Sequence, residues 1–193
     1  MADEPKVKAT LVTSTMTFVR NTLGEAALQG ILANMDCKEL TARRGILPSD
    51  RVPERTYRDL LVGAGKALAA TPGSRKPKEY FFEMGRFLAK DMVNKYYRSL
   101  ISMFDIKFML TKSPHIWGLV HSHGSVKIEP VGKNGVYVYI IDYPWPCKEF
   151  CYMMRGYIWA VGELTKAEVL GLEEQECVTE GAKCCKYFGQ WKA

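Results

Sequence analysis

The hydrophobic pattern of the chain changes near Ser113-Pro114, and this change restricts the fold class more than any other feature. Before it, apolar residues recur at helical spacing in three stretches, which predicts helices over 18–35, from about 53, and over 79–95. A further helical stretch is predicted from about residue 97 to Leu110, and Ser113-Pro114 ends it. The first half is therefore expected to be helical.

Beyond the change, strand patterns dominate. Residues 124–131 and 136–143 are rich in Val, Ile and Tyr, and the Asn134-Gly135 pair between them is typical of a tight hairpin. A helix is predicted over 146–164, followed by strands over 167–179 and 183–191 that join at Gly181. This order predicts an α+β fold, with a twisted antiparallel four-stranded sheet packed on one side by helices.

Length and composition favour a single cytoplasmic domain. The 193 residues suit one domain over 9–193, with residues 1–8 as a flexible tail. No apolar run approaches the roughly 20 residues of a membrane span, and the start lacks the pattern of a secretory signal. The net charge of +6 is modest and forms no clear basic face, so neither a nucleic-acid partner nor membrane insertion is expected.

Clustered cysteines are the strongest chemical signal. Five of the six cysteines lie between residues 147 and 185. In a cytosolic protein such clustering indicates metal binding or redox chemistry more often than disulfides. Cys177 and Cys185 enclose the pattern Cys-x3-Gly-x3-Cys, so a turn at Gly181 returns the two thiols to opposite each other. Two thiolates on a hairpin provide half of a tetrahedral zinc site.

The other half of such a site has several sources. Cys151 lies near the start of the preceding helix, Cys147 lies one turn earlier, and Glu174 or Glu176 offers an oxygen. Glu174 and Cys177 are three residues apart, so a regular strand would point them to opposite faces and a bulge is required. The alternative is that these cysteines are ordinary buried apolar residues.

The segment from Pro144 to Trp191 resembles the 4-vinyl reductase-like domain, which also forms the aromatic-effector sensor of some bacterial transcription activators. The shared pattern is a helix with an early Cys, followed by Glu-x2-Cys-x3-Gly-x3-Cys. The resemblance implies zinc as the cofactor and a ligand set of Cys151, Glu174, Cys177 and Cys185. Replacement of a ligand by Cys147 or Cys184 stays open, as does an iron–sulfur cluster in place of zinc.

The wider chain is similar to an uncharacterised bacterial family of the same superfamily. The likeness is carried by Phe18-Val-Arg-Asn-Thr-Leu-Gly-Glu and Tyr80-Phe-Phe-Glu-Met-Gly-Arg. That superfamily includes the TRAPP vesicle-tethering subunits. The resemblance therefore implies a TRAPP-like fold and a homodimer formed through helices.

Together these features predict a non-enzymatic, zinc-stabilised binding module rather than an enzyme. Its cavity, between the 79–96 and 147–164 helices, is expected to take a small hydrophobic or aromatic molecule and to signal through a separate protein partner. The predicted ligand-binding residues are Phe81, Phe82, Phe87 and Tyr157. One alternative is a reductase acting on a tetrapyrrole or another conjugated substrate, although no nicotinamide or flavin fingerprint is present. Another is an assembly or tethering protein. The roles of His121 and His123 stay open.

Overall fold

The structure, a computed structural model, describes residues 3–36, 40, 46–96, 105–165 and 167–192. The first half is mainly helical, with two short strands: β1 (Lys6–Lys8), α1 (Ala9–Leu23), α2 (Glu25–Ala33), β2 (Arg51–Pro53), α4 (Glu54–Ala69) and α5 (Pro77–Tyr96). The second half holds the main sheet: α6 (Ile106–Val120), β3 (Ser125–Val131), β4 (Gly135–Ile141), α7 (Lys148–Leu164), β5 (Glu168–Glu176), a 3-10 turn (Val178–Glu180) and β6 (Cys185–Lys192).

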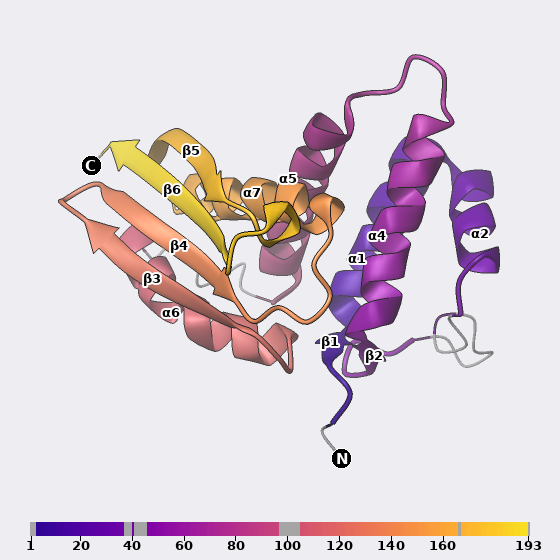
Figure 1. Cartoon of the computed structure of the whole chain (residues 1–193), viewed down its shortest axis with the longest axis horizontal. Helices are drawn as coiled ribbons and strands as arrows, with labels where there is room; N and C mark the ends of the chain where they lie inside the picture. Colours follow the sequence, from indigo (N-terminus) through magenta and orange to yellow (C-terminus); the bar gives the residue numbers. More distant parts are fainter. Residues whose placement is uncertain (1–2, 37–39, 41–45, 97–104, 166, 193) are drawn as a thin grey trace.

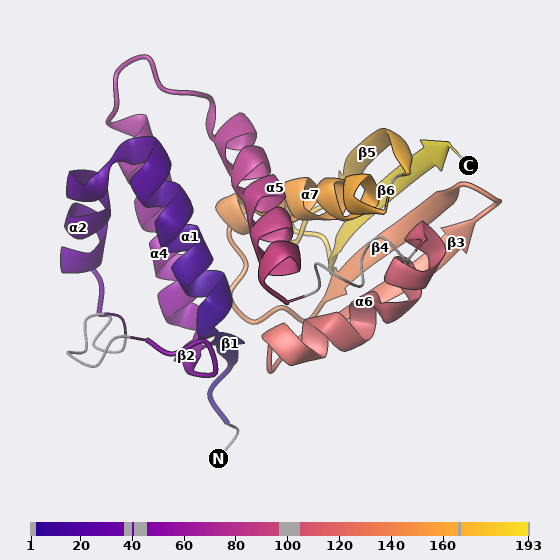
Figure 2. The same cartoon turned by 180° about the vertical axis from the view of Figure 1, so that it is seen from behind.

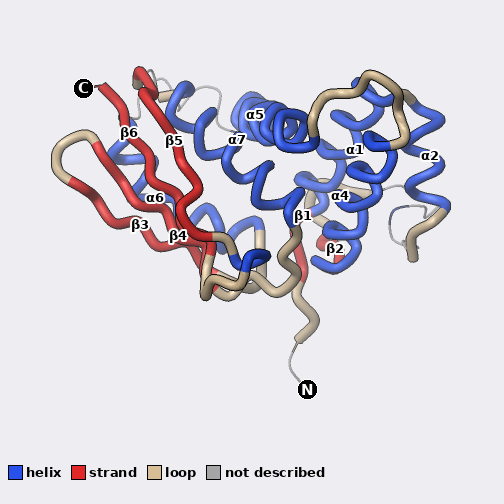
Figure 3. The backbone as a smooth tube through the Cα atoms, turned by 45° about the horizontal axis from the view of Figure 1, so that its top comes forward, coloured by secondary structure: helices blue, strands red, loops and turns tan. Residues whose placement is uncertain are grey.

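The main sheet has the strand order β3-β4-β6-β5, and every neighbouring pair is antiparallel. Helices α6 and α7 lie along one face of this sheet, while α1, α2 and α4 form a separate bundle on the far side of α5 (Figures 1 and 2). Figure 3 shows the same division into a sheet layer and a helical layer. The predicted mixed α+β class with a four-stranded antiparallel sheet is confirmed.

The N-terminal region departs from the sequence expectation. Val7 is completely buried in β1, which pairs with β2, although residues 1–8 were expected to form a tail. The predicted helix over 18–35 is two helices, because Gly24 adopts a φ of +91° between them. The first of these begins at Ala9, within a run of threonines whose hydroxyls donate to carbonyls one helical turn earlier, as Thr15 does to Leu11 at 2.9 Å.

Helix α6 also differs from the prediction. It continues through Pro114 to Val120, and its start is fixed by Asp105, whose carboxylate accepts a hydrogen bond from the Phe108 N–H at 2.7 Å. Residues 97–104, where the sequence places the beginning of a helix, lie outside the described residues. In the part of the chain that is described, no helix is long and apolar enough to cross a membrane.

Two glycines set the contact between α5 and α7. A Cβ at Gly85 would lie 1.9 Å from the Met153 carbonyl oxygen, and a Cβ at Gly156 would lie 1.9 Å from the Phe82 carbonyl oxygen. The two backbones therefore touch directly, and no side chain fits between them. Farther along the crossing, the Arg86 guanidinium pairs with the Glu163 carboxylate at 2.9 Å.

We predict that Gly85→Ala and Gly156→Ala each destabilise the protein by about 2–3 kcal/mol or more, because the added methyl meets backbone that cannot move independently. Denaturant unfolding followed by circular dichroism measures this change. The control is Gly118→Ala on α6, where a Cβ meets nothing within 4 Å. There the better helix propensity of alanine should stabilise the protein by up to about 1 kcal/mol. Equal effects at the three positions would contradict the close crossing.

Candidate ligand cavity and cysteine cluster

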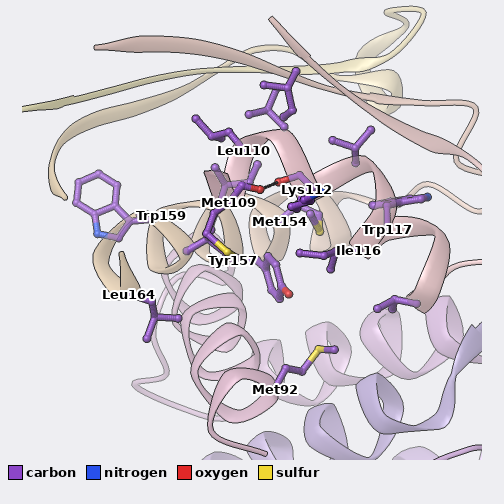
Figure 4. A pocket seen from close by; sticks show the side chains of 18 of the residues that line it. Met92, Met109, Leu110, Lys112, Ile116, Trp117, Met154, Tyr157, Trp159 and Leu164 are labelled. Atoms are coloured by element: carbon purple, nitrogen blue, oxygen red, sulfur yellow. Dashed lines mark hydrogen bonds between the residues drawn. The ribbon is translucent and has the colours of Figure 1, made fainter. Parts of the chain in front are cut away.

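A cavity of about 820 Å³ lies between the sheet and the helices that cover it. Figure 4 shows the side chains of α6 and α7 gathered beneath the sheet, with Met92 of α5 at the opposite side of the space. Its volume falls within the range of about 300–1,000 Å³ typical of small-molecule sites. Apolar side chains form most of its wall: Val126, Ile128, Val136, Val138, Ile140, Ile116, Trp117, Met154, Tyr157 and Ile158.

The apolar wall follows from the residue pattern of β4. Val136, Val138 and Ile140 alternate along this strand, so all three face the cavity side and are almost fully buried. Tyr137 and Tyr139 alternate to the opposite face, where the Tyr137 ring packs against the ring of Phe188 in β6. The sequence pattern thus predicts one covered apolar face, while the presence of a cavity beneath it depends on how α6 and α7 are placed.

Part of the wall carries a buried polar group. His121 lines the cavity and is only 5% exposed, and its Nδ1 lies 2.7 Å from Glu54 Oε1. The Tyr143 hydroxyl donates to Glu54 Oε2 at 2.9 Å, and Glu54 itself is completely buried. Burial and the adjacent Glu54 carboxylate raise the pKa of Tyr143 well above its usual value. The His121 ring stacks on Trp117 with centroids 4.1 Å apart.

Of the four residues predicted to bind a ligand, Tyr157 lines the cavity. Phe81 is fully buried against the Tyr80 ring, Phe82 packs against Trp159, and Phe87 packs against Phe18. Phe81 belongs to the core and Phe87 packs against it, whereas Phe82 is half-buried; none of the three is among the described residues of the cavity wall.

The two histidines whose roles the sequence left open lie in different places. His121 lines the cavity, whereas His123 lies outside the cavity wall, and its carbonyl accepts a hydrogen bond from the Trp117 indole N–H at 3.1 Å. Nothing in the sequence singles out Glu54, because an acidic residue in the first turn of a helix is common.

The second feature is a cluster of three cysteines and one glutamate between the first turn of α7 and the final hairpin. Cys151 Sγ lies 3.3 Å from Cys177 Sγ and 3.6 Å from Cys185 Sγ. With an oxygen of Glu174, the four candidate ligand atoms all lie within 4.8 Å of one another. The three thiols are buried, and Glu174 Oε1 is buried without a hydrogen-bond partner.

Local backbone geometry brings these residues together. The β5–β6 register shifts between Glu174 and Glu176, which is the irregularity that the three-residue spacing to Cys177 requires. The chain then makes a 3-10 turn and passes Gly181 in the left-handed conformation at φ +94°. Cys147 and Cys184 lie outside the cluster.

The thiols perturb one another. The hydrogen bond with Cys151 lowers the pKa of the Cys185 thiol to about 7, and the same contact raises the pKa of Cys151 strongly. Burial raises the pKa of Cys147 to about 12. Cys185 is therefore the thiol of the cluster that loses its proton most readily.

The fold is similar to that of several solved H-NOX domains. An H-NOX protein from S. oneidensis in the Fe(II)NO ligation state is 11% identical over 96% of this chain and 99% of that chain, with a TM-score of 0.71. A mutant of an S. oneidensis H-NOX protein in the Fe(II) state gives 12% identity, 96% coverage of both chains and a TM-score of 0.73. This chain has the H-NOX fold.

A third similar structure is an oxygen-binding H-NOX domain related to soluble guanylate cyclases. It is 17% identical over 96% of this chain and 95% of that chain, with a TM-score of 0.68. No protein-family model matches the sequence, and no curated protein matches it.

The comparisons correct two predictions. The resemblance to 4-vinyl reductase-like and TRAPP-like domains is wrong, because the similar structures are H-NOX domains. It rested mainly on a helix and a hairpin, which do not determine how the other helices are arranged. Zinc as the cofactor is also wrong by this comparison, because the names of the similar structures refer to iron and heme.

The described wall of the cavity holds two histidines. His115 is exposed, whereas His121 is buried, with its Nδ1 bonded to Glu54 and its ring stacked on Trp117. Histidines that bind a metal usually hold their second ring nitrogen against a carboxylate or carbonyl, so the bond to Glu54 does not exclude heme. Heme also carries two propionates, whose burial requires cationic or donor groups, and the lysines on the wall are Lys8 and Lys112.

We predict that iodoacetamide labels Cys184 before the clustered thiols in the native protein. Cys184 is half-buried, whereas Cys151, Cys177 and Cys185 are almost inaccessible, and a thiolate must be reachable to react. Unfolding removes the contact with Cys151 that lowers the pKa of Cys185, so in the unfolded protein Cys185 should label at about the same rate as Cys184. Peptide mass mapping at successive times measures the order, with urea-unfolded protein as the control. Labelling of Cys185 before Cys184 in the native protein would show that the cluster is accessible to solvent and would contradict its burial.

Proposed function

We propose that this protein is a non-enzymatic binding module whose cavity holds a small, largely apolar molecule, and that occupancy is passed to a protein partner. The observation that carries the proposal is the cavity of about 820 Å³ with its almost continuous apolar wall. An aromatic molecule suits this wall, because Trp117 and Tyr157 offer ring edges and faces at its border.

Physical chemistry favours an occupant of this kind. A void lined by Val, Ile and Met side chains forfeits the dispersion contacts that a filled core would make. A bound apolar molecule restores those contacts and stabilises the folded state in proportion to its concentration.

The arrangement of helices suggests how occupancy would reach a partner. Cavity-lining residues lie on α6 and on α7, and α7 is locked against α5 at Gly85 and Gly156. A ligand that shifts α7 would therefore move α5 with it. The homodimer and the separate signalling partner are part of this proposal, and native mass spectrometry of gently purified protein would report both the oligomeric state and any retained small molecule.

We predict that the neutral fluorescent probe N-phenyl-1-naphthylamine binds the wild-type protein, and that Ile116→Trp weakens this binding at least about tenfold by filling the cavity. Ile116 points into the space from α6 (Figure 4). Leu170→Trp is the matched control, because Leu170 is 60% exposed on β5 and lies outside the cavity wall. Fluorescence titration measures the three affinities.

Two outcomes would contradict the proposal. One is equal probe affinity in the Ile116 and Leu170 variants, which would place the probe on the surface. The other is a one-to-one hemin complex with a sharp Soret band that displaces the probe, which would favour a heme-binding protein.

We further infer that Cys151, Glu174, Cys177 and Cys185 form a structural metal site. The support is the unpartnered Glu174 Oε1 beside three converging thiols. The sulfur of Cys151 lies 3.3 Å from that of Cys177 and 3.6 Å from that of Cys185, so one ion between them can contact all three. Four protein ligands leave no open position for a substrate.

We predict one metal ion per chain in protein purified without chelators, and its loss in the Cys177→Ser, Cys185→Ser double variant. Metal loss should lower the unfolding free energy by about 4 kcal/mol or more, because the ion ties α7 to the final hairpin. Plasma mass spectrometry identifies the element and its amount, and denaturant unfolding gives the stability. Cys184→Ser is the control and should keep the metal. Metal-free wild-type protein of unchanged stability would refute the site.

A further inference from the structure

One row of residues on α6 borders both the cavity and the solvent. Its members, which recur at intervals of four, three and four residues along one side of the helix, are Phe108, Lys112, His115 and Leu119. All four are exposed, and all four also line the cavity. Because wall residues that reach the solvent mark an opening, this row forms one side of the mouth of the cavity.

The Lys112 ammonium is available to an anion at this mouth. Its Nζ lies 5.6 Å from the centroid of the Phe108 ring, one turn earlier, so the charge stays close to the row. A cation over an aromatic ring at an exposed site is held only weakly. Within the described part of the chain, no carboxylate pairs with Lys112. The ammonium can therefore pair with a ligand that enters the cavity.

The charged residues of the described wall are all basic. Lys112 comes from α6 and Lys8 from β1, and the described wall residues include no aspartate or glutamate. The histidines of the wall, His115 and His121, carry no negative charge in either protonation form. The wall therefore disfavours a cationic ligand and complements an anionic one.

The cost of burying a charge decides which end of such a ligand enters the cavity. The inner wall includes the almost fully buried side chains Val136, Val138 and Ile140 of β4. A carboxylate placed against them would lose its hydration without gaining a partner. At the α6 row it keeps water on one side and gains the ammonium on the other. The inner wall and the mouth thus suit the two ends of one amphipathic molecule.

We propose that the cavity takes an apolar molecule with one carboxylate, whose apolar body lies inside and whose carboxylate pairs with Lys112 at the mouth. This inference rests on the proposed function and names the class of molecule that the cavity selects. Lys112 is then a specificity-determining residue that distinguishes an acid from its neutral analogues. Lys8 adds positive potential from the β1 side of the wall.

The test compares 2-naphthoate with 2-naphthamide, which have nearly the same shape and differ in charge. Both affinities are measured by competition against N-phenyl-1-naphthylamine, and the quantity of interest is the ratio of the naphthoate affinity to the naphthamide affinity. The wild-type protein should bind the naphthoate at least as tightly as the naphthamide. In Lys112→Met, which removes the charge and keeps an unbranched side chain, the ratio should fall about three- to fivefold, because ion pairs at exposed positions are modest. The naphthamide affinity should not change, which shows that the variant is folded.

Lys107→Met is the matched control. Lys107 is exposed on the same helix but lies outside the described cavity wall, so its loss changes the net charge equally and should leave the ratio at the wild-type value. Lys112→Glu should lower the ratio further than Lys112→Met, because the new carboxylate repels that of the ligand. Added salt should weaken naphthoate binding to the wild-type protein without affecting the naphthamide, since ions screen an exposed pair.

The outcomes separate this inference from the proposed function. If the neutral probe and the naphthamide bind but the ratio is the same in Lys112→Met as in the wild type, the carboxylate assignment is overturned and the proposed function stands. An equal fall in Lys107→Met would also overturn it, because net charge rather than a contact would then set the ratio. Naphthoate binding that is unaffected by Ile116→Trp would place the acid outside the cavity, with the same consequence. Failure of the neutral probe and both naphthalenes to bind the wild-type protein would remove the proposed function and this inference together.

Discussion

The close crossing of α5 and α7 is the constraint on which the rest of the structure depends. Since Gly85 and Gly156 allow backbone to meet backbone, α7 lies deep between the helical layer and the sheet. From that position it presents Tyr157 and Met154 to the cavity and Cys151 to the final hairpin. Larger residues at the two glycines would push α7 toward the sheet and into the cavity space. The cavity and the cysteine cluster are therefore consequences of one helix contact.

The elements whose signals are local could be predicted from the sequence. The Asn134-Gly135 hairpin, α5, α7 and the last two strands lie where alternation and helical periodicity place them. The early start of α1 could not be predicted, because threonine-rich segments favour turns unless tertiary packing holds them helical. Helix α6 passes through Pro114, since a single missing hydrogen bond is tolerated when Trp117 and Val120 are buried against the rest of the molecule.

The two parts of the candidate site also differ in how far the sequence predicts them. The cysteine cluster was accessible from the sequence because its spacing encodes a turn, a bulge and a helix start. The Glu54–His121–Tyr143 group was not, because residues 67 and 89 positions apart meet only when β1, α4 and the end of α6 pack together. A local motif also suggested the wrong family. Identities of 11–17% with the similar H-NOX structures show how little sequence accompanies the shared fold.

Polar groups at the wall restrict the ligands of such a cavity more than its volume does. An apolar space between a sheet and two helices accepts a broad class of ring-containing molecules, so its volume alone selects weakly. Selection therefore depends on the few polar residues that border it. Here His121 is a buried polar residue on the described wall, and Glu54 and Trp117 fix the position of its ring. Since Glu54 comes from α4 and His121 follows α6, the packing of the helical half of the molecule determines which buried polar group the cavity presents.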